Sequence, residues 1–209
     1  MKRILAQGFT LVELLIVIAL LGVIATIVIA AINPIEQANR ATDAGMKADA
    51  SQMVSAIQRY YVTHNAFPWM VVTPLTYPGA DTYFPFVSAT NKNVGICGAS
   101  CTDEGELITS SELQSTFLGK NWITTTDKTS MLYVGHGGSA SAGVYVCWVP
   151  KSDSDRKNAI VNKHAMNLVS GFDANTFLPV SPSACTVSTD TGWGTISGTL
   201  PTCAECVPE

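Results

Sequence analysis

An unbroken apolar run near the N-terminus constrains this chain more than any other feature. Residues Leu14–Ile32 read LLIVIALLGVIATIVIAAI, and Thr26 is their single polar residue. About twenty apolar residues are enough for one helix to cross the hydrocarbon core of a bilayer. The run therefore predicts a membrane-spanning helix over residues 14–32.

A single acid, Glu13, directly precedes this run. A secretory signal has an apolar segment of only about 7–15 residues and is cut behind it at small residues, so cleavage near Ala30-Ala31 is an alternative that the length disfavours. A carboxylate at the edge of the lipid costs free energy unless a cation lies near it. Cleavage between Gly8 and Phe9 would create such a cation, a free α-amine, on the same chain or on a neighbouring copy.

The residues around Glu13 resemble a known processing signal. Gly8-Phe-Thr-Leu-Val-Glu13-Leu-Leu-Ile-Val-Ile is similar to the class III signal of type IV pilins and of the pseudopilins of type II secretion. The resemblance implies that residues 1–8 are a leader, that a prepilin peptidase cuts after Gly8 and N-methylates Phe9, and that Glu13 pairs with the terminal amine of an adjacent subunit. It covers about Lys2–Ala31 and weakens through Trp69.

The helix is expected to continue beyond the membrane, over residues 9–64. Many members of the family carry a proline at the position of Ala30, whereas this chain has Pro34, where we expect a kink rather than an end. Apolar residues at three- and four-residue spacing then predict an amphipathic helix packed on a globular domain. These residues are Met46, Ala50, Met53, Val54, Ile57, Tyr60 and Tyr61.

Local signals mark the end of this helix and its solvated face. Asn65 suits a helix C-terminus, and Pro68 disfavours helix at the residue before it. Acid-to-base pairs at four-residue spacing, Glu36–Arg40 and Asp43–Lys47, are expected on the solvated surface.

Residues 65–209 are long enough for one extracytoplasmic globular head with a modest core. Strand-like runs lie at Met131–Val134, Gly143–Val149, Asn121–Thr125 and Thr195–Thr199. In the second run, Val144, Val146 and Trp148 alternate with Tyr145 and Cys147, which predicts two different faces. His136-Gly-Gly-Ser is typical of a hairpin connection between the first two runs. Ser110–Leu118 is expected to be a short helix, capped by Ser110 or Ser111. The predicted fold class is α+β: a long N-terminal helix, membrane-spanning in its first half, packed on a small antiparallel sheet, disulfide-stabilised and pilin-like.

Charge gives the expected orientation and excludes one class of partner. Lys2-Arg3 is the basic cluster beside the apolar run, so the positive-inside rule keeps the N-terminus cytoplasmic and the head outside. The chain has 12 basic and 16 acidic residues; without Lys2 and Arg3 these become 10 and 16, a net charge of −6. We expect no nucleic-acid partner, because such binding needs Lys and Arg to neutralise phosphates.

The cysteines all follow the apolar run, on the side where disulfides form and persist. They are Cys97, Cys101, Cys147, Cys185, Cys203 and Cys206. We predict the pairs Cys97–Cys101, Cys147–Cys185 and Cys203–Cys206; the middle pair follows the resemblance, because the family often has a disulfide in its C-terminal part. Two alternatives are four-cysteine zinc binding by the outer pairs and a redox-active Cys203-x-x-Cys206.

No enzymatic constellation is specific in this sequence. Three histidines lack neighbouring triad signatures and are expected to be solvated or structural: His64, His136 and His164. Four tryptophans are expected in the core: Trp69, Trp122, Trp148 and Trp193. Asp153-Ser-Asp155 resembles the start of a calcium loop but lacks the glycine and distal glutamate of an EF-hand. Because some related pseudopilins bind calcium in the head, Asp153 and Asp155 remain candidate ligands; no other cofactor or metal is expected.

These observations predict a structural subunit and not an enzyme. The resemblance implies a precursor that spans the inner or cytoplasmic membrane once, and a helical homo-oligomeric filament outside the cell. It implies a prepilin peptidase, an assembly ATPase and a platform membrane protein as partners. One alternative is a pseudopilin of a type II secretion or competence (DNA-uptake) system. Another is a binding module or enzyme that uses the run only as an anchor, which Glu13 disfavours because a plain anchor needs no acid at the membrane edge.

Overall fold

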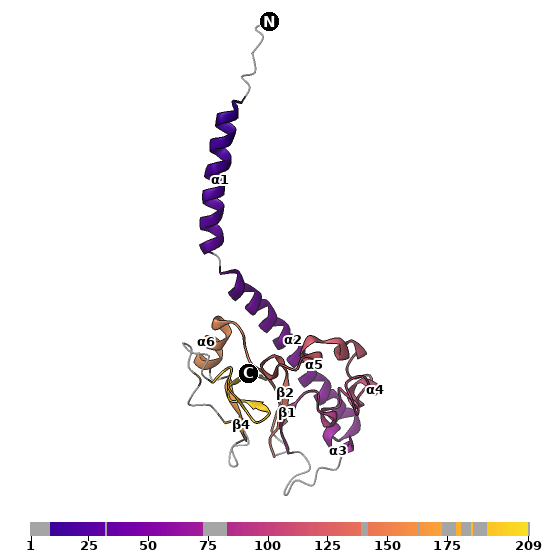
Figure 1. Cartoon of the computed structure of the whole chain (residues 1–209). Helices are drawn as coiled ribbons and strands as arrows, with labels where there is room; N and C mark the ends of the chain where they lie inside the picture. Colours follow the sequence, from indigo (N-terminus) through magenta and orange to yellow (C-terminus); the bar gives the residue numbers. More distant parts are fainter. Residues whose placement is uncertain are drawn as a thin grey trace. The chain divides into compact units, whose positions relative to one another are not determined.

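The chain divides into two compact units, residues 1–38 and residues 39–209, which we call the N-terminal unit and the head. The computed structural model describes residues 9–31, 33–72, 83–138, 142–162, 164–172, 179–180, 185 and 192–208. Helix α1 (Leu11–Ala31) belongs to the N-terminal unit. Helix α2 (Pro34–His64) begins there and continues as the longest helix of the head (Figure 1).

The helix predicted over residues 9–64 is two helices. Asn33 is the N-cap of α2, because its Oδ1 accepts a hydrogen bond from the Glu36 backbone N–H at 3.2 Å and its carbonyl accepts one from Gln37 at 3.3 Å. Pro34 takes the first helical position, where a missing N–H costs nothing. The expected kink within one helix was therefore wrong, since Asn33-Pro34 starts a new one.

The far end of α2 agrees with the prediction. The Asn65 backbone N–H donates to the Tyr61 carbonyl at 2.8 Å, and Asn65 has φ 52°, the left-handed conformation that ends many helices. Pro68 then begins the short helix α3 (Pro68–Val72). The predicted apolar stripe of α2 is confirmed at its centre, where Ala50, Met53 and Ile57 are fully buried.

An antiparallel sheet of six strands forms the centre of the head. Its strand order is β1 (Phe84–Ser88), β2 (Tyr133–His136), β3 (Val144–Trp148), β8 (Ala204–Val207), β4 (Ala165–Phe172) and β5 (Pro179–Val180). Each neighbouring pair is antiparallel. Strands β6 (Ile196–Ser197) and β7 (Leu200–Pro201) pair in a separate small hairpin, which directly precedes β8 in the sequence. The predicted α+β class is confirmed.

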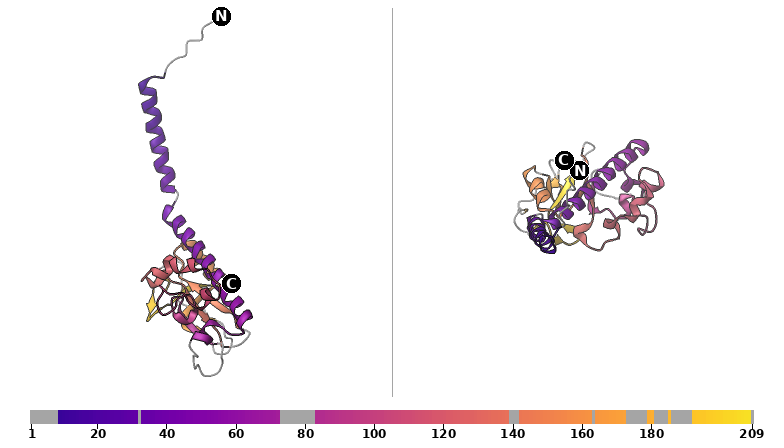
Figure 2. Two further views of the ribbon diagram at one scale, coloured as in Figure 1. Left: turned by 90° about the vertical axis from the view of Figure 1, so that its right-hand side faces the viewer. Right: turned by 90° about the horizontal axis from the view of Figure 1, so that it is seen from above.

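Both faces of strand β3 are buried, each in a different core. Val144, Val146 and Trp148 share the main core with Met53 and other buried residues of α2, so this helix covers one face of the sheet (Figure 2). Tyr145 and the other odd-numbered residue, Cys147, belong to a second core. This is the predicted alternation, which follows from the two-residue period of a strand.

The second core is closed by the sheet itself. Strand β1 contacts β4, although β2, β3 and β8 separate them in the strand order, so the sheet curls. Phe172 of β4 stacks on Phe86 of β1, with ring centroids 4.8 Å apart, and lies 6.0 Å from the Tyr145 ring. Curling therefore buries a face that a flat sheet would leave to solvent.

Short helices fill the remaining parts of the head. They are η1 (Lys92–Val94), α4 (Glu106–Thr109), η2 (Ser115–Gly119), α5 (Asn121–Thr124), η3 (Lys128–Ser130) and α6 (Asp153–Val161). Helices α4 and α6 lie on opposite sides of the head, as Figures 1 and 2 agree.

Two local predictions in this part of the chain were wrong. The predicted strand at Asn121–Thr125 is helix α5, because the Lys120 carbonyl accepts hydrogen bonds from Ile123 and Thr124. The predicted helix over Ser110–Leu118 is interrupted: Ser110 is the C-cap of α4, and Ser111 has φ 63°. A residue in the left-handed conformation cannot continue a helix.

Three disulfides cross-link the head, and their pairing corrects the prediction in part. Cys97–Cys101 is confirmed, but the other two bonds are Cys147–Cys206 and Cys185–Cys203. Cys147 lies directly opposite Cys206 in the β3–β8 register. Cys203 precedes β8 and lies in a different core from Cys206. No cysteine is left as a thiolate for a zinc or redox site.

The prediction of a core position is confirmed for the tryptophans, and the three histidines lie in different surroundings. All four tryptophans are buried, with at most 3% exposure. His136, on β2, is buried beside the stacked Phe67 and Trp69 rings, whose centroids lie 4.7 and 5.9 Å from its own. His64 stacks on Tyr60 at 4.1 Å. His164 lies between α6 and β4, where its backbone N–H donates to the Ala159 carbonyl.

Candidate functional site

The N-terminus of α1 is closed by a reciprocal set of hydrogen bonds between Thr10 and Glu13. The Thr10 backbone N–H and hydroxyl donate to Glu13 Oε2 at 2.9 and 2.8 Å, and the Glu13 N–H donates to Thr10 Oγ1 at 3.2 Å. This is a capping box, in which a Thr and a Glu three residues later satisfy each other's backbone donors. The spacing Thr-x-x-Glu was readable in the sequence, but the sequence analysis missed Thr10.

The capping box leaves half of the Glu13 carboxylate available. Both bonds from Thr10 go to Oε2, and Oε1 accepts no hydrogen bond from the described residues. The carboxylate also lies at the N-terminal, positive end of the helix dipole. Glu13 is thus held in place by its own chain while one oxygen can still accept from a cation.

Helix α1 presents apolar side chains on every side. Those with large apolar groups are between 44% exposed (Val17) and 84% exposed (Leu11). Its one hydroxyl, on Thr26, donates to the Val23 carbonyl of the same helix at 2.7 Å. Within the described residues, α1 is the one helix whose length and composition would let it cross a membrane, over Leu11–Ile29. A helix that is apolar all round is stable when something outside it covers these faces.

The predicted processing residues lie at the edge of the described chain. Phe9 is 81% exposed and precedes the capping box directly. Gly8 and the rest of the predicted leader, residues 1–8, lie outside the described residues. In the sequence, the peptide bond expected to be cut thus lies two residues before α1, which begins at Leu11.

The candidate calcium ligands lie in a helix and not in a loop. Asp153 and Asp155 occupy the first turn of α6, where the Ser152 hydroxyl caps the helix by accepting from the Asp155 N–H at 3.2 Å. Acids in a first turn are explained by the helix dipole alone. No group of three His, Cys, Asp or Glu side chains able to hold a metal occurs in the described part of the chain.

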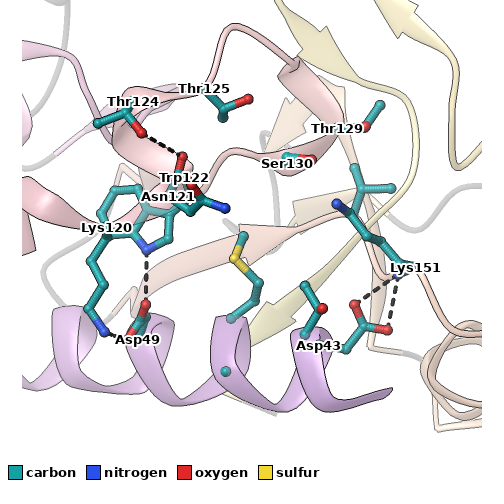
Figure 3. Close-up of a pocket in the computed structure, with 14 residues that line it drawn as sticks. Asp43, Asp49, Lys120, Asn121, Trp122, Thr124, Thr125, Thr129, Ser130 and Lys151 are labelled. Carbon is teal, nitrogen blue, oxygen red and sulfur yellow. Dashed lines mark hydrogen bonds and ion pairs between the residues drawn. The ribbon is translucent and has the colours of Figure 1, made fainter. Parts of the chain in front are cut away.

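Two carboxylates on α2 bind this helix to other parts of the head, and neither contact was predicted from the sequence. Asp43, expected on the solvated face, is only 2% exposed; its oxygens accept from the backbone N–H groups of Lys151 and Ser152 at 2.7–3.0 Å. Asp49 accepts from Lys120 Nζ at 2.8 Å and from Trp122 Nε1 at 3.0 Å (Figure 3). Burial raises the pKa of Asp43, and the hydrogen bonds from Lys151 and Ser152 oppose that rise.

A comparison with known families finds a match to most of α1 and to the residues before it. Residues 5–29 match the family described as the prokaryotic N-terminal methylation motif, the class III prepilin signal of type IV pilins and pseudopilins. The match includes Gly8, Phe9, Thr10 and Glu13. Searches of curated proteins and of solved structures found no match. The chain therefore carries a class III prepilin signal, which supports a type IV pilin- or pseudopilin-like precursor.

Proposed function

We propose that the mature chain is a structural subunit of a type IV pilus-like filament, assembled through α1 after a prepilin peptidase cuts between Gly8 and Phe9. The observation that carries this proposal is α1 itself. Its apolar faces have no partner within the described chain, and identical helices from neighbouring subunits would bury them in a bundle. The subunit then acts by assembly and not by catalysis, without a cofactor.

Glu13 gives this assembly its register. Cleavage after Gly8 creates an α-amine on Phe9, and Glu13 Oε1 of a neighbouring subunit is free to accept from it. A carboxylate and an ammonium buried together among apolar helices stabilise each other, whereas either one left alone is costly. The bundle therefore favours the offset between subunits that joins the two charges.

The filament implies further partners and a final location. An assembly ATPase and a platform membrane protein would move subunits from the membrane into the filament, and the head would lie outside the cytoplasm. A pseudopilus of a type II secretion or competence system is the second candidate, because the same signal occurs in pseudopilins. A membrane-anchored enzyme or binding module is disfavoured, because an anchor has no use for a half-free carboxylate at its N-terminal end.

Variants of Glu13 test the charge pairing apart from the capping box. Glu13→Gln keeps a side-chain oxygen that can accept from Thr10, since Gln also serves at this position of a capping box, but it removes the charge. We expect at least ten-fold fewer sheared filaments in the native host, with processed subunit still present in the membrane. Thr10→Val, which breaks the box and keeps the charge, should reduce filaments far less.

The controls in this experiment separate assembly from folding and processing. Mass spectrometry of the membrane-bound subunit should find methylated Phe9 as the first residue in wild type and in both variants. The three disulfides should form normally, because they lie in the head. Wild-type filament levels from Glu13→Gln would show that Glu13 does not register subunits by charge. A mature N-terminus at or beyond Ala31 would exclude the pilin-like subunit altogether.

A further inference from the structure

A pocket of about 470 Å³ lies in the head between α2, α5 and the residues around Lys151, and no proposed function uses it (Figure 3). This volume is within the range of small-molecule sites, roughly 300–1,000 Å³. The polar lining comes from hydroxyl, amide and ammonium groups and from the carboxylates of Asp43 and Asp49. Met46, Trp122 and Val149 supply the apolar part. The pocket lies entirely within the head.

Several polar groups of this pocket keep hydrogen-bonding capacity that no described residue uses. The Asn121 amide and the Lys151 ammonium make no hydrogen bond to any described residue, and both point into the pocket in Figure 3. The Thr125 hydroxyl accepts from the Asp127 N–H but donates to no described group. The pocket thus offers donors from three directions.

Acceptors are present on the same wall. Thr129 and Ser130 use their hydroxyl hydrogens on Asp127, at distances of 2.7–2.9 Å, so their oxygens retain lone pairs. Donors and acceptors placed side by side suit a ligand whose own groups do both, and hydroxyl groups do both. This lining therefore favours a polyhydroxylated ligand.

Of the charged side chains that line the pocket, the Lys151 ammonium is the one that could bind an anionic group of a ligand. Asp43 is occupied by the backbone N–H groups of Lys151 and Ser152, and Asp49 by Lys120 and Trp122. Among the described residues, the Lys151 ammonium makes no hydrogen bond and is attracted through space by Asp127. A ligand carboxylate could bind there without competing with a fixed ion pair.

Gly45 of α2 gives an independent sign that something outside the chain approaches this pocket. It lines the pocket inside a helix, where glycine is less stable than alanine. A Cβ added to Gly45 would meet nothing within 4 Å, and its backbone is not left-handed. Neither packing nor conformation of the chain explains the glycine, but a ligand resting against the helix backbone does.

We propose that this pocket binds an acidic saccharide. Its ring would lie against α2 at Gly45, and its carboxylate would bind the Lys151 ammonium. Its hydroxyl groups would bind the Asn121 amide and the hydroxyls of Thr125, Thr129 and Ser130. The carboxylate separates this ligand from a neutral sugar, and the ring hydroxyls separate it from an acidic peptide. The inference concerns the head alone and does not depend on filament assembly.

Calorimetric titration of the full mature chain in detergent micelles tests the ligand class. The probes are digalacturonic acid, the neutral disaccharide digalactose and the tetrapeptide Asp-Gly-Asp-Gly. We expect digalacturonic acid to bind with a Kd below about 1 mM and the other two at least ten-fold more weakly. The proposal would be overturned if digalactose or the peptide bound as tightly as digalacturonic acid. It would also be overturned if digalacturonic acid did not bind at concentrations up to about 10 mM.

Three variants locate the binding site. Lys151→Met keeps the aliphatic stem and should weaken digalacturonic acid about ten-fold, to the level of digalactose; Lys92→Met, an exposed lysine outside the pocket, should change nothing. Gly45→Ala should raise the Tm by about 1–4 °C and yet weaken binding several-fold. Because this variant is more stable than wild type, its loss of binding cannot come from misfolding. Unchanged binding in Lys151→Met or in Gly45→Ala would place the ligand elsewhere.

Discussion

Helices α1 and α2 follow one another in the chain, but their apolar residues have opposite surroundings. In α1 the large apolar side chains are all at least 44% exposed, whereas Ala50, Met53 and Ile57 of α2 are fully buried against the sheet. The difference follows from pattern, because α1 is apolar on every side and α2 on one stripe. An apolar stripe can be covered by its own chain, while a helix apolar all round needs lipid or other helices.

The carboxylates of the two helices differ in the same way. Asp43 in α2 has its oxygens occupied by backbone N–H groups of the head, and Glu13 at the start of α1 has one oxygen occupied by Thr10 and one left over. A fully used buried carboxylate stabilises a fold, whereas a half-used exposed one can serve a contact between molecules. The acids of the two helices therefore differ as their apolar residues do: those of α2 serve the fold, and that of α1 is available for contacts between molecules.

The largest expected difference between the two helices comes from truncating matched isoleucines. Ile57→Ala should lower the free energy of unfolding of the head by about 2–5 kcal/mol, because it removes buried methyl groups and leaves a cavity. Ile24→Ala, at a residue 55% exposed, should leave it unchanged and reduce filament yield instead. Urea unfolding followed by tryptophan fluorescence, in detergent, measures the first. Equal losses of head stability from both variants would contradict the division of roles.

Removing the buried carboxylate should have a smaller effect on the same measurement. Asp43→Ala leaves the N–H groups of Lys151 and Ser152 without a partner in a buried place, at a cost of about 1–3 kcal/mol. Glu13→Ala should not change head stability at all. Ser51→Ala, an exposed change on α2, controls for altered helix propensity and should lie within about 0.5 kcal/mol of wild type. If Asp43→Ala matched that control, Asp43 would not fasten α2 to the head.

The smallest expected effect is an alkaline loss of stability confined to the head. Burial, with a contribution from Asp127, raises the pKa of Tyr133 from 10.0 to about 12, and its hydroxyl donates to the Lys128 carbonyl at 2.7 Å. Below pH 10 both folded and unfolded chains hold this proton, so the stabilisation is complete. Between pH 10 and 12 the unfolded chain loses the proton first, and stability falls.

Tyr133→Phe isolates this contribution. The variant should lack the part of the decline between pH 10 and 12 that Tyr133 causes, after a constant loss of about 1 kcal/mol for its hydrogen bond. Unfolding free energies measured from pH 9 to 12 for both proteins check the difference. Helix α1 contains no tyrosine, so it cannot contribute to the effect. An identical pH dependence in the variant would assign the decline to other groups.

Local patterns predicted the parts of this molecule that depend on neighbouring residues. The apolar run predicted α1, and the alternation in Val144–Trp148 predicted the two faces of β3. The stripe from Met46 to Tyr61 predicted the buried face of α2 but was wrong at Tyr61, which is 36% exposed. Asn33-Pro34 also carried a local signal, an N-cap followed by a proline at the first helical position. That signal was read as a kink because the helix was expected to continue on both sides.

The errors lie where distant residues decide. Asn121–Thr125 has the composition of a strand, yet it is helical, and its Trp122 donates to Asp49 on another helix. Asp43 has a base four residues later, and the sequence cannot reveal that backbone N–H groups more than a hundred residues away will use its oxygens. The pocket beside Gly45 is equally out of reach of the sequence, because its walls come from α2, α5 and the residues around Lys151.

The sequence by itself determined that the described chain begins with an apolar helix that has an acid in its first turn. The length and composition of the run and the Thr-x-x-Glu spacing are local properties, and they decide this without distant residues. The sequence also determined that the six cysteines could form disulfides. Only the tertiary structure decided which cysteines pair, because the β3–β8 register sets Cys147 opposite Cys206, whereas Cys203 lies in another core and bonds to Cys185. Pairing depends on distance in space, which residues far apart in the sequence set together.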